Sequence, residues 1–322
     1  MNPNSLKSTD IVRSIINNYE SDNPNTQYSL RNILMSGNLG GTGKLVILPV
    51  DQGFEHGPDR SFSINPDAYD PHYHYQLAID AGMSAYAAPL GMLESGIESF
   101  SVDIPSALST TTRRVSKIPL ILKCNSANSL SKVPNQAITG SVKDAIRLNC
   151  SGVGFTIYPG SDNIYEMMEE AREIFEEAKE HGLVCVLWSY PRGSMSKEGE
   201  TAINVVSYAA HMAALCGAHI IKVKLPTKFL EPDSTKDVFI KNNIPIDTLT
   251  DRVKHIIKSA FNGRRIVVFS GGAAKNDDEL MEEIKAIKNG GGFGSIIGRN
   301  SFQRPKEKAL KLLKEIMDIY KK

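Results

Sequence analysis

Hydrophobic residues in this chain recur in short runs that are separated by longer amphipathic stretches. The pattern is regular from Lys44 onward, and near-continuous apolar runs of this length are typical of strands buried on both faces. The eight runs are KLVILPVD (44–51), SAYAAPL (84–90), PLILKCN (119–125), GVGFTIYP (152–159), LVCVLWSYP (183–191), HIIKVKL (219–225), RIVVFSG (265–271) and GSIIGRN (294–300).

The stretches between these runs have helical periodicity. The clearest covers residues 163–182, where Met, Ala, Ile and Phe occupy one stripe and a glycine ends the pattern. Strands that alternate with such helices predict a parallel sheet covered by helices. Eight units fit a closed (β/α)8 TIM barrel over residues 44–322, and an open doubly wound sheet is the alternative. The other helix-like stretches are 203–217, 249–263, 276–290 and 304–322.

The first 43 residues do not follow this alternation. They are rich in Asn and Ser, contain two short helical patterns and end in a glycine-rich turn. We interpret residues 1–43 as an N-terminal helical extension that packs on the barrel, rather than as a second domain.

Composition and charge narrow the class of protein. The chain is 41% hydrophobic and 23% charged with a formal net charge of +1, which gives no electrostatic footprint for nucleic acid or an acidic membrane surface. No stretch approaches the roughly 18 apolar residues of a membrane span, and the N-terminus lacks a signal-peptide core. The four cysteines are far apart and form no C-x-x-C pair. Three of them have apolar surroundings, so we expect buried free thiols in a cytoplasmic protein.

Two lysines interrupt the sixth apolar run. Lys222 and Lys224 are two positions apart, so they lie on the same face of a strand. Outward lysines on an edge strand are one interpretation, but a closed barrel has no edge and an unpaired ammonium in its interior is costly. Two ammonium groups about 7 Å apart repel by roughly 2 kcal/mol at an effective dielectric of ~20, which lowers one pKa. A neutral amine attacks carbonyls, so the run predicts a Schiff-base lysine and leaves open which of the two it is.

The first apolar run ends in the sequence VDQGFEHGP. Asp51 stands at the C-terminal end of the strand, where barrels carry catalytic groups, and Glu55 and His56 follow. From spacing alone, it is an equally good interpretation that Asp51 caps the following loop and that Glu55 and His56 are only solvated. Metal catalysis through His56, His72 or His74 is a further alternative. His72 and His74 are two positions apart at a predicted helix start, so they diverge, and we expect no metal site.

The fifth run ends in the sequence VLWSYPRG. Trp188 is the only tryptophan of the chain, it shares a face with Tyr190, and Arg192 follows at the rim. One interpretation is an aromatic plug in the barrel mouth. The other is a tyrosine hydroxyl that faces an amine-lined pocket and moves protons.

The last two runs end in the glycine-containing sequences FSGGAAK and GSIIGRN. Glycines at strand tips leave backbone N–H groups free, and Arg299 adds a positive charge. TIM barrels frequently bind phosphate at the loops after these two strands. The two tips therefore predict a phosphate site.

These motifs together resemble the archaeal-type class I fructose-1,6-bisphosphate aldolases, also called DhnA-type aldolases. VDQGFEHGP, WSYPRG, IIKVK, SGG and GRN occur in the order of that family and on the corresponding strands, over about residues 44–305. The resemblance implies a Schiff-base lyase of glycolysis and gluconeogenesis. It would cleave fructose 1,6-bisphosphate reversibly to dihydroxyacetone phosphate and glyceraldehyde 3-phosphate, with no cofactor, because an iminium acts as the electron sink.

The resemblance also implies roles for individual residues. Lys222 corresponds to the Schiff-base lysine, Tyr190 to the general acid/base, Trp188 to the neighbouring aromatic residue and Asp51 to the acidic residue after the first strand. Lys123, on the third strand, is a further candidate to face the pocket. The implied phosphate-binding positions are Ser270, Gly271, Gly272, Gly298, Arg299 and Arg192.

Other functions fit part of the same pattern. Related lysine barrels catalyse a transaldolase-like step toward aromatic amino acids or acyl-group transfer in signal-molecule breakdown. These relatives usually lack the tryptophan of WSYPRG, so Trp188 favours the aldolase. A non-enzymatic sugar-phosphate sensor is a third candidate. The expected partners are small sugar phosphates and further copies of the chain, since barrels of this family are commonly homo-oligomers.

Overall fold

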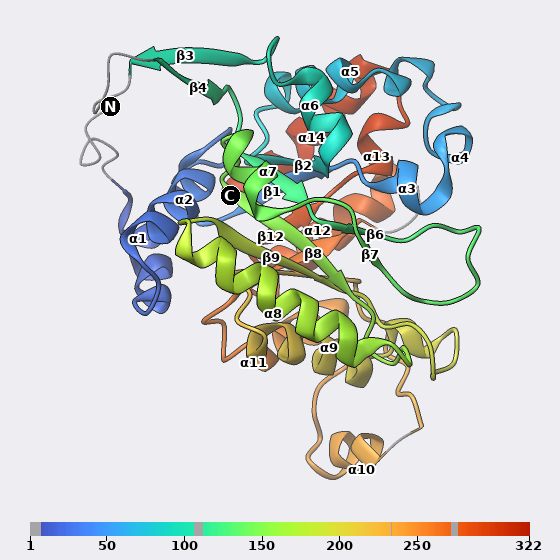
Figure 1. Cartoon of the computed structure of the whole chain (residues 1–322). Helices are drawn as coiled ribbons and strands as arrows, with labels where there is room; N and C mark the ends of the chain where they lie inside the picture. Colours follow the sequence, from blue (N-terminus) through green and yellow to red (C-terminus); the bar gives the residue numbers. More distant parts are fainter. Residues whose placement is uncertain (1–7, 106–111, 233, 272–275) are drawn as a thin grey trace.

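The computed structural model describes residues 8–105, 112–232, 234–271 and 276–322 (Figure 1). Parallel strands close into a barrel in the order β1-β12-β11-β10-β9-β8-β5-β2. All eight predicted strands are present, so the (β/α)8 barrel is confirmed and the open sheet is wrong. The barrel strands are β1 (Leu45–Pro49), β2 (Ala85–Pro89), β5 (Leu120–Lys123), β8 (Gly152–Ile157), β9 (Val184–Ser189), β10 (Ile220–Val223), β11 (Ile266–Ser270) and β12 (Gly294–Ile296).

Helices surround the barrel, and the longest form where the sequence predicts them. In the helix over residues 164–180, Met167, Ala171, Phe175 and Ala178 are buried on one face, and Gly182 follows its end with φ +75°. The helices are α1 (Asp10–Ile16), α2 (Pro24–Met35), α3 (Gln52–His56), α4 (Pro58–Phe62), α5 (Pro71–Asp80), α6 (Leu90–Gly96), α7 (Val142–Arg147), α8 (Ile164–Glu180), α9 (Ile203–Leu215), α10 (Ser234–Lys241), α11 (Leu249–Ser259), α12 (Asp277–Asn289), α13 (Arg299–Phe302) and α14 (Lys306–Lys321).

Alternation along β10 separates the core into two layers. Ile221 and Val223 are buried in the cluster between strands and helices, whereas Ile220 belongs to the cluster inside the barrel. Lys222 shares the parity of Ile220, and its ammonium lies 5.3 Å from the ring centroid of the interior Trp188. The alternation predicted from the sequence therefore places Lys222 inside the barrel.

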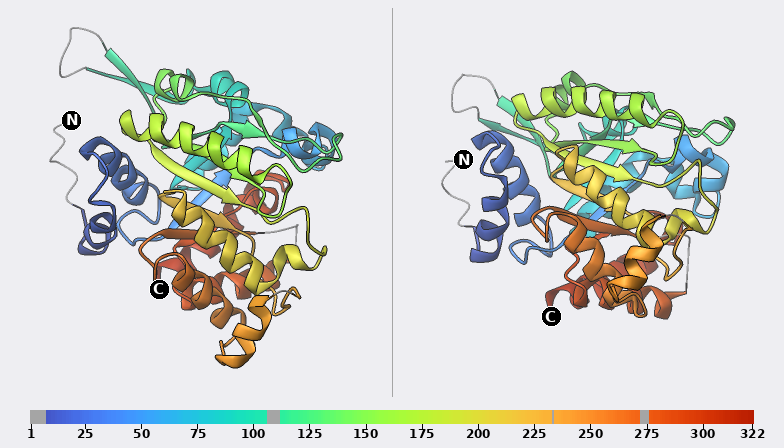
Figure 2. Two further views of the ribbon diagram at one scale, coloured as in Figure 1. Left: turned by 60° about the horizontal axis from the view of Figure 1, so that its bottom comes forward. Right: turned by 90° about the horizontal axis from the view of Figure 1, so that it is seen from below.

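The N-terminal extension covers the end of the barrel at which the strands begin (Figure 2). Apolar residues of α1 and α2, such as Val12 and Ile33, are buried in one cluster with Leu45, Val184 and Ile266 from the starts of three strands. The hydrophobic stripes of α1 and α2 thus fill the bottom of the barrel.

A buried polar network joins the extension to the barrel. The Tyr19 hydroxyl donates to the carbonyl of His219 at 2.7 Å and accepts the N–H of Ile266 at 3.1 Å. His219 Nδ1 accepts the N–H of Cys185 at 2.8 Å, and its Nε2 lies 3.1 Å from an Asp22 carboxylate oxygen. The extension therefore bonds directly to the residue before β10 and to the first residue of β11, and His219 connects this network to β9.

Two small antiparallel pairs were not foreseen from the sequence. The pair β3 (Ser101–Pro105) and β4 (Thr112–Ser116) projects from the body, and the pair β6 (Asn125–Ser126) and β7 (Ala137–Ile138) follows β5 (Figure 1). Cys124, Cys150 and Cys185 are buried free thiols, as predicted. Within the described ranges, every helix is too short or too polar to cross a bilayer.

Candidate active site

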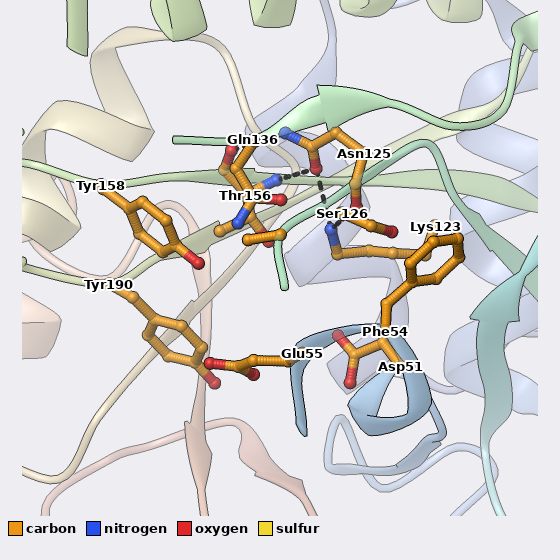
Figure 3. Close-up of a pocket in the computed structure, with 11 residues that line it drawn as sticks. Asp51, Phe54, Glu55, Lys123, Asn125, Ser126, Gln136, Thr156, Tyr158 and Tyr190 are labelled. Carbon is orange, nitrogen blue, oxygen red and sulfur yellow. Dashed lines mark hydrogen bonds between the residues drawn. The ribbon is translucent and has the colours of Figure 1, made fainter. Parts of the chain in front are cut away.

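A cavity opens at the carboxyl ends of the barrel strands. Its volume is about 670 Å³, and it reaches Lys222 on β10 and residues from the tips of β1, β9, β11 and β12. A second cavity of about 20 Å³ adjoins it on the side of β5 and β8 (Figure 3). Asp51, Glu55 and Tyr190 line both cavities.

Lys222 has the environment of a reactive amine. Its side chain is 5% exposed, and its ammonium lies 5.3 Å from the ring centroids of both Trp188 and Tyr190. Burial lowers the pKa of Lys222 to about 8. The carboxylates of Asp51 and Glu55 act against this and raise the pKa, whereas the charges of Lys123 and Arg299 lower it further. With a pKa near 8, about one amine in ten is neutral at pH 7, compared with fewer than one in a thousand for an ordinary lysine.

Lys224 corrects one part of the sequence-based argument. It lies nearer the rim, and its ammonium bonds the Glu200 carboxylate at 2.7 Å. The expected repulsion from Lys224 is therefore not what makes Lys222 reactive. Burial is the main cause, and the like charges that act on Lys222 are Lys123 and Arg299.

Lys123 is the second lysine of the barrel interior. It is 3% exposed, its ammonium donates to the backbone carbonyl and the side-chain oxygen of Asn125, and it lies 5.6 Å from the Trp188 ring centroid. Burial lowers its pKa to about 8. The structure thus places Lys222 and Lys123 over the same indole, with Lys222 in the large cavity and Lys123 in the small one.

Tyr190 is half-buried between the two cavities. Burial raises the pKa of its hydroxyl well above the ordinary value, and the negative charges of Asp51 and Glu55 raise it further, against a hydrogen bond with Ser270. Tyr190 is therefore a neutral phenol at physiological pH. Asp51 stands two residues after the end of β1, at the N-terminus of α3.

The predicted phosphate positions come together along one wall of the large cavity. Ser270 is the last residue of β11 and Gly271 follows it, and Gly298 and Arg299 lie just after β12. A Cβ atom on Gly298 would lie 2.8 Å from the carbonyl oxygen of Pro49, so this tip requires glycine. Gly272 lies outside the described residues.

Arg192 also lines the large cavity, but in this structure it is already paired. Its guanidinium forms an ion pair with Glu55, donates to the Tyr158 hydroxyl at 3.3 Å and stacks 4.7 Å from the Tyr158 ring centroid. Burial alone would raise the pKa of Glu55, but the charge and hydrogen bond of Arg192 lower it overall. Glu55 is therefore an anion at neutral pH.

The histidines do not gather at one point. His56 lines the large cavity, whereas His72 bonds the Ser95 carbonyl and the buried His74 bonds the Ala68 carbonyl. Across the described ranges, no group of three or more His, Cys, Asp and Glu side chains could hold a metal ion.

Comparison with known proteins identifies the family. The family described as DeoC/LacD family aldolase matches residues 45–304. This chain belongs to that family.

Individual members of this aldolase family extend the match. A protein of Chlamydia trachomatis named probable fructose-bisphosphate aldolase class 1 is 36% identical and aligns with 98% of this chain and 90% of its own length. The fructose-bisphosphate aldolase class 1 of Halobacterium salinarum is 33% identical, over 81% of this chain and 85% of its own. These relatives confirm the resemblance to class I aldolases.

A solved structure matches the aldolase barrel as well. It is an archaeal fructose-1,6-bisphosphate aldolase whose catalytic lysine is covalently bound to the carbinolamine intermediate of the substrate. The TM-score is 0.71 at 29% identity, and the match covers 90% of this chain and 98% of that one.

Several residues of this aldolase site were not singled out from the sequence. The sequence left open whether Glu55 is a site residue or a solvated loop residue, and its ion pair with Arg192 was not foreseen. Asn125 follows Lys123 by two positions, so alternation alone could have placed both on one face. The small cavity also includes Gln136, Thr156 and Tyr158, which are contributed by two separate loops and a strand.

Proposed function

We propose that this chain is a class I fructose-bisphosphate aldolase that cleaves fructose 1,6-bisphosphate reversibly to dihydroxyacetone phosphate and glyceraldehyde 3-phosphate. The observation that carries the proposal is Lys222, a buried amine with a pKa of about 8 that opens into a cavity of about 670 Å³. The aldolase family and the class I aldolases among its relatives support the same reaction.

The first step joins the substrate to Lys222. The neutral amine attacks the C2 ketone and forms a carbinolamine, which then loses its C2 oxygen as water and becomes an iminium. A proton must reach the departing hydroxyl. Tyr190 is suited to supply it, because the raised pKa keeps its hydroxyl protonated and its ring lies 5.3 Å from the Lys222 ammonium.

The second step breaks the C3–C4 bond. The electron pair of that bond moves into the iminium and gives an enamine, while the C4 hydroxyl loses its proton and becomes the aldehyde of glyceraldehyde 3-phosphate. A neutral tyrosine accepts this proton only if it gives its own hydroxyl proton to another group. Asp51, one of the two carboxylates that line both cavities with Tyr190, can take that proton. Protonation of the enamine at C3 and hydrolysis of the imine release dihydroxyacetone phosphate.

The order of strands around the barrel orients the substrate. Lys222 on β10 holds C2, and the predicted phosphate positions lie on the neighbouring strands β11 and β12. The C1 phosphate therefore goes to Ser270, Gly271, Gly298 and Arg299. Carbons C3 to C6 extend to the other side of β10, toward β9, where Arg192 can hold the C6 phosphate.

A coupled assay tests the function, and reductive trapping tests the mechanism. We expect cleavage of fructose 1,6-bisphosphate, measured by triose-phosphate detection, to survive EDTA and to be lost in Lys222→Met. Borohydride added with dihydroxyacetone phosphate should trap an adduct on Lys222. An adduct mapped to Lys224 or Lys123 would overturn the lysine assignment. No cleavage by the parent protein would favour the transaldolase-like enzyme, the acyl transferase or the sensor.

The cellular setting and assembly follow from the same proposal. Three buried free thiols support a reducing compartment, so we place the enzyme in the cytoplasm, in glycolysis or gluconeogenesis. We propose a homo-oligomer in which residues 1–43 are an integral part of each barrel, not a separate domain. Cell fractionation tests the first point, and light scattering of the purified protein tests the second.

A further inference from the structure

The ion pair between Glu55 and Arg192 spans the mouth of the barrel. Glu55 lies on α3, directly after β1, and Arg192 lies in the loop after β9. In the closed order of strands, β1 and β9 are four strands apart in both directions, so they face each other across the barrel. We call this pair the latch.

The latch stands between two compartments. The β10, β11 and β12 side holds the large cavity with Lys222, whereas the β5 and β8 side holds the small cavity with Lys123 and Tyr158. Glu55 lines both cavities, and Figure 3 shows it among the residues of the small one. A small cavity of about 20 Å³ holds little more than one water molecule, so no sugar carbon enters it while the latch is closed.

The Arg192 side of the latch is built to accept an anion. Its guanidinium is stacked on Tyr158 and bonded to the Tyr158 hydroxyl, so the planar group keeps its position when the carboxylate leaves. Arginine binds phosphate with paired N–H donors, and a phosphate monoester carries about −1.5 to −2 charges against −1 for a carboxylate. A substrate phosphate can therefore displace Glu55.

We propose that Glu55 is a specificity-determining residue, because its carboxylate occupies Arg192 until the C6 phosphate of the substrate replaces it. This inference rests on the proposed function. Substrates with a C6 phosphate open the latch and join the two compartments, whereas a ketose 1-phosphate without that group leaves the latch closed. Glu55 thus competes with one end of the substrate only.

Steady-state kinetics with two substrates test the proposal. In Glu55→Gln the competitor loses its charge at nearly constant size, so we expect KM for fructose 1,6-bisphosphate to fall about threefold to tenfold. For fructose 1-phosphate, KM should stay within twofold of the parent. In the double variant Glu55→Gln/Arg192→Gln, the effect of Glu55→Gln on the bisphosphate should disappear, because its partner is absent.

A matched control separates the latch from general electrostatics. Glu200→Gln removes another carboxylate of the same cavity, one that pairs with Lys224. We expect it to change KM for both substrates alike. The proposal is overturned if Glu55→Gln lowers KM equally for both substrates, if its effect persists without Arg192, or if KM for the bisphosphate is unchanged or raised.

A binding measurement tests the latch independently of the aldolase reaction. Calorimetric titration with inorganic phosphate should give tighter binding to Glu55→Gln than to the parent, and no such difference when both carry Arg192→Gln. If the parent cleaves no bisphosphate, the proposed function fails while this titration still tests the latch. Equal phosphate affinity in parent and Glu55→Gln would reject the latch even in an active aldolase.

Discussion

The reactivity of Lys222 depends on the charged groups around its ammonium. Burial lowers its pKa most, and Lys123 is the first of the like charges that act in the same direction. Lys224 has the same sequence spacing as a charge partner, but Glu200 binds its ammonium. Removal of Lys123 should therefore change the pKa of Lys222, whereas removal of Lys224 should not.

Substitutions of Lys123 and of Lys224 should have different effects on the pH profile of the enzyme. Attack on the ketone needs the neutral amine, so kcat/KM should rise with pH through the pKa of Lys222, near 8. Lys123→Met removes a positive charge and should raise that pKa, which moves the rising limb of the profile to higher pH. Lys224→Met should leave the limb in place. A shift in Lys224→Met alone would restore the repulsion argument that the sequence suggested.

Tyr190 allows chemistry to be separated from binding. Tyr190→Phe keeps the ring against the Lys222 ammonium and removes only the hydroxyl. General acid–base catalysis typically contributes about 10²–10⁴-fold, so kcat for cleavage should fall within that range while KM changes little. Borohydride should still trap an adduct on Lys222. A kcat within twofold of the parent would instead make Tyr190 a structural plug and leave the proton to Asp51.

At the scale of elements, the sequence predicts what depends on local periodicity. Each barrel strand is a compact apolar run, and alternation puts Lys222 inside the barrel because Ile221 and Val223 must face the helices. The choice between Lys222 and Lys224 could not come from alternation, since both have the same parity. Depth in the barrel decides it, and depth depends on how far each strand extends beyond its neighbours.

Local periodicity in the sequence could not predict the contacts between loops. Glu55 and Arg192 are 137 positions apart, and their pairing requires that β1 and β9 face each other in a closed ring. The barrel was predictable from eight similar units, but the conformations of α3 and of the loop after β9 were not. For the same reason, the sequence predicts phosphate positions at the strand tips but does not predict the carboxylate that pairs with Arg192.

At the scale of the whole molecule, the extension and the active site lie at opposite ends of the same strands. His219 immediately precedes β10 and bonds Cys185 near the start of β9, and those two strands carry Lys222 and Trp188 toward their other ends. The extension reaches this layer through Tyr19, whose hydroxyl serves two strands at once. The fold thus uses residues 8–43 to satisfy backbone groups that a bare barrel would expose at its base.

Tyr19→Phe tests whether the extension is part of the barrel or an addition to it. The substitution keeps the buried ring and leaves the Ile266 N–H and the His219 carbonyl without their shared partner. An unsatisfied buried group costs about 1–3 kcal/mol, so the free energy of unfolding should fall by about that amount. Because the change lies at the opposite end from Lys222, kcat should stay close to that of the parent. Denaturant unfolding measures the free energy of unfolding, and the coupled assay measures kcat.

Tyr28→Phe, which removes a hydroxyl from a partly exposed ring of α2, is the matched control and should change neither quantity. Unchanged stability in Tyr19→Phe would mean that the extension contributes little to the barrel, and that residues 44–322 hold the catalytic strands in place without it.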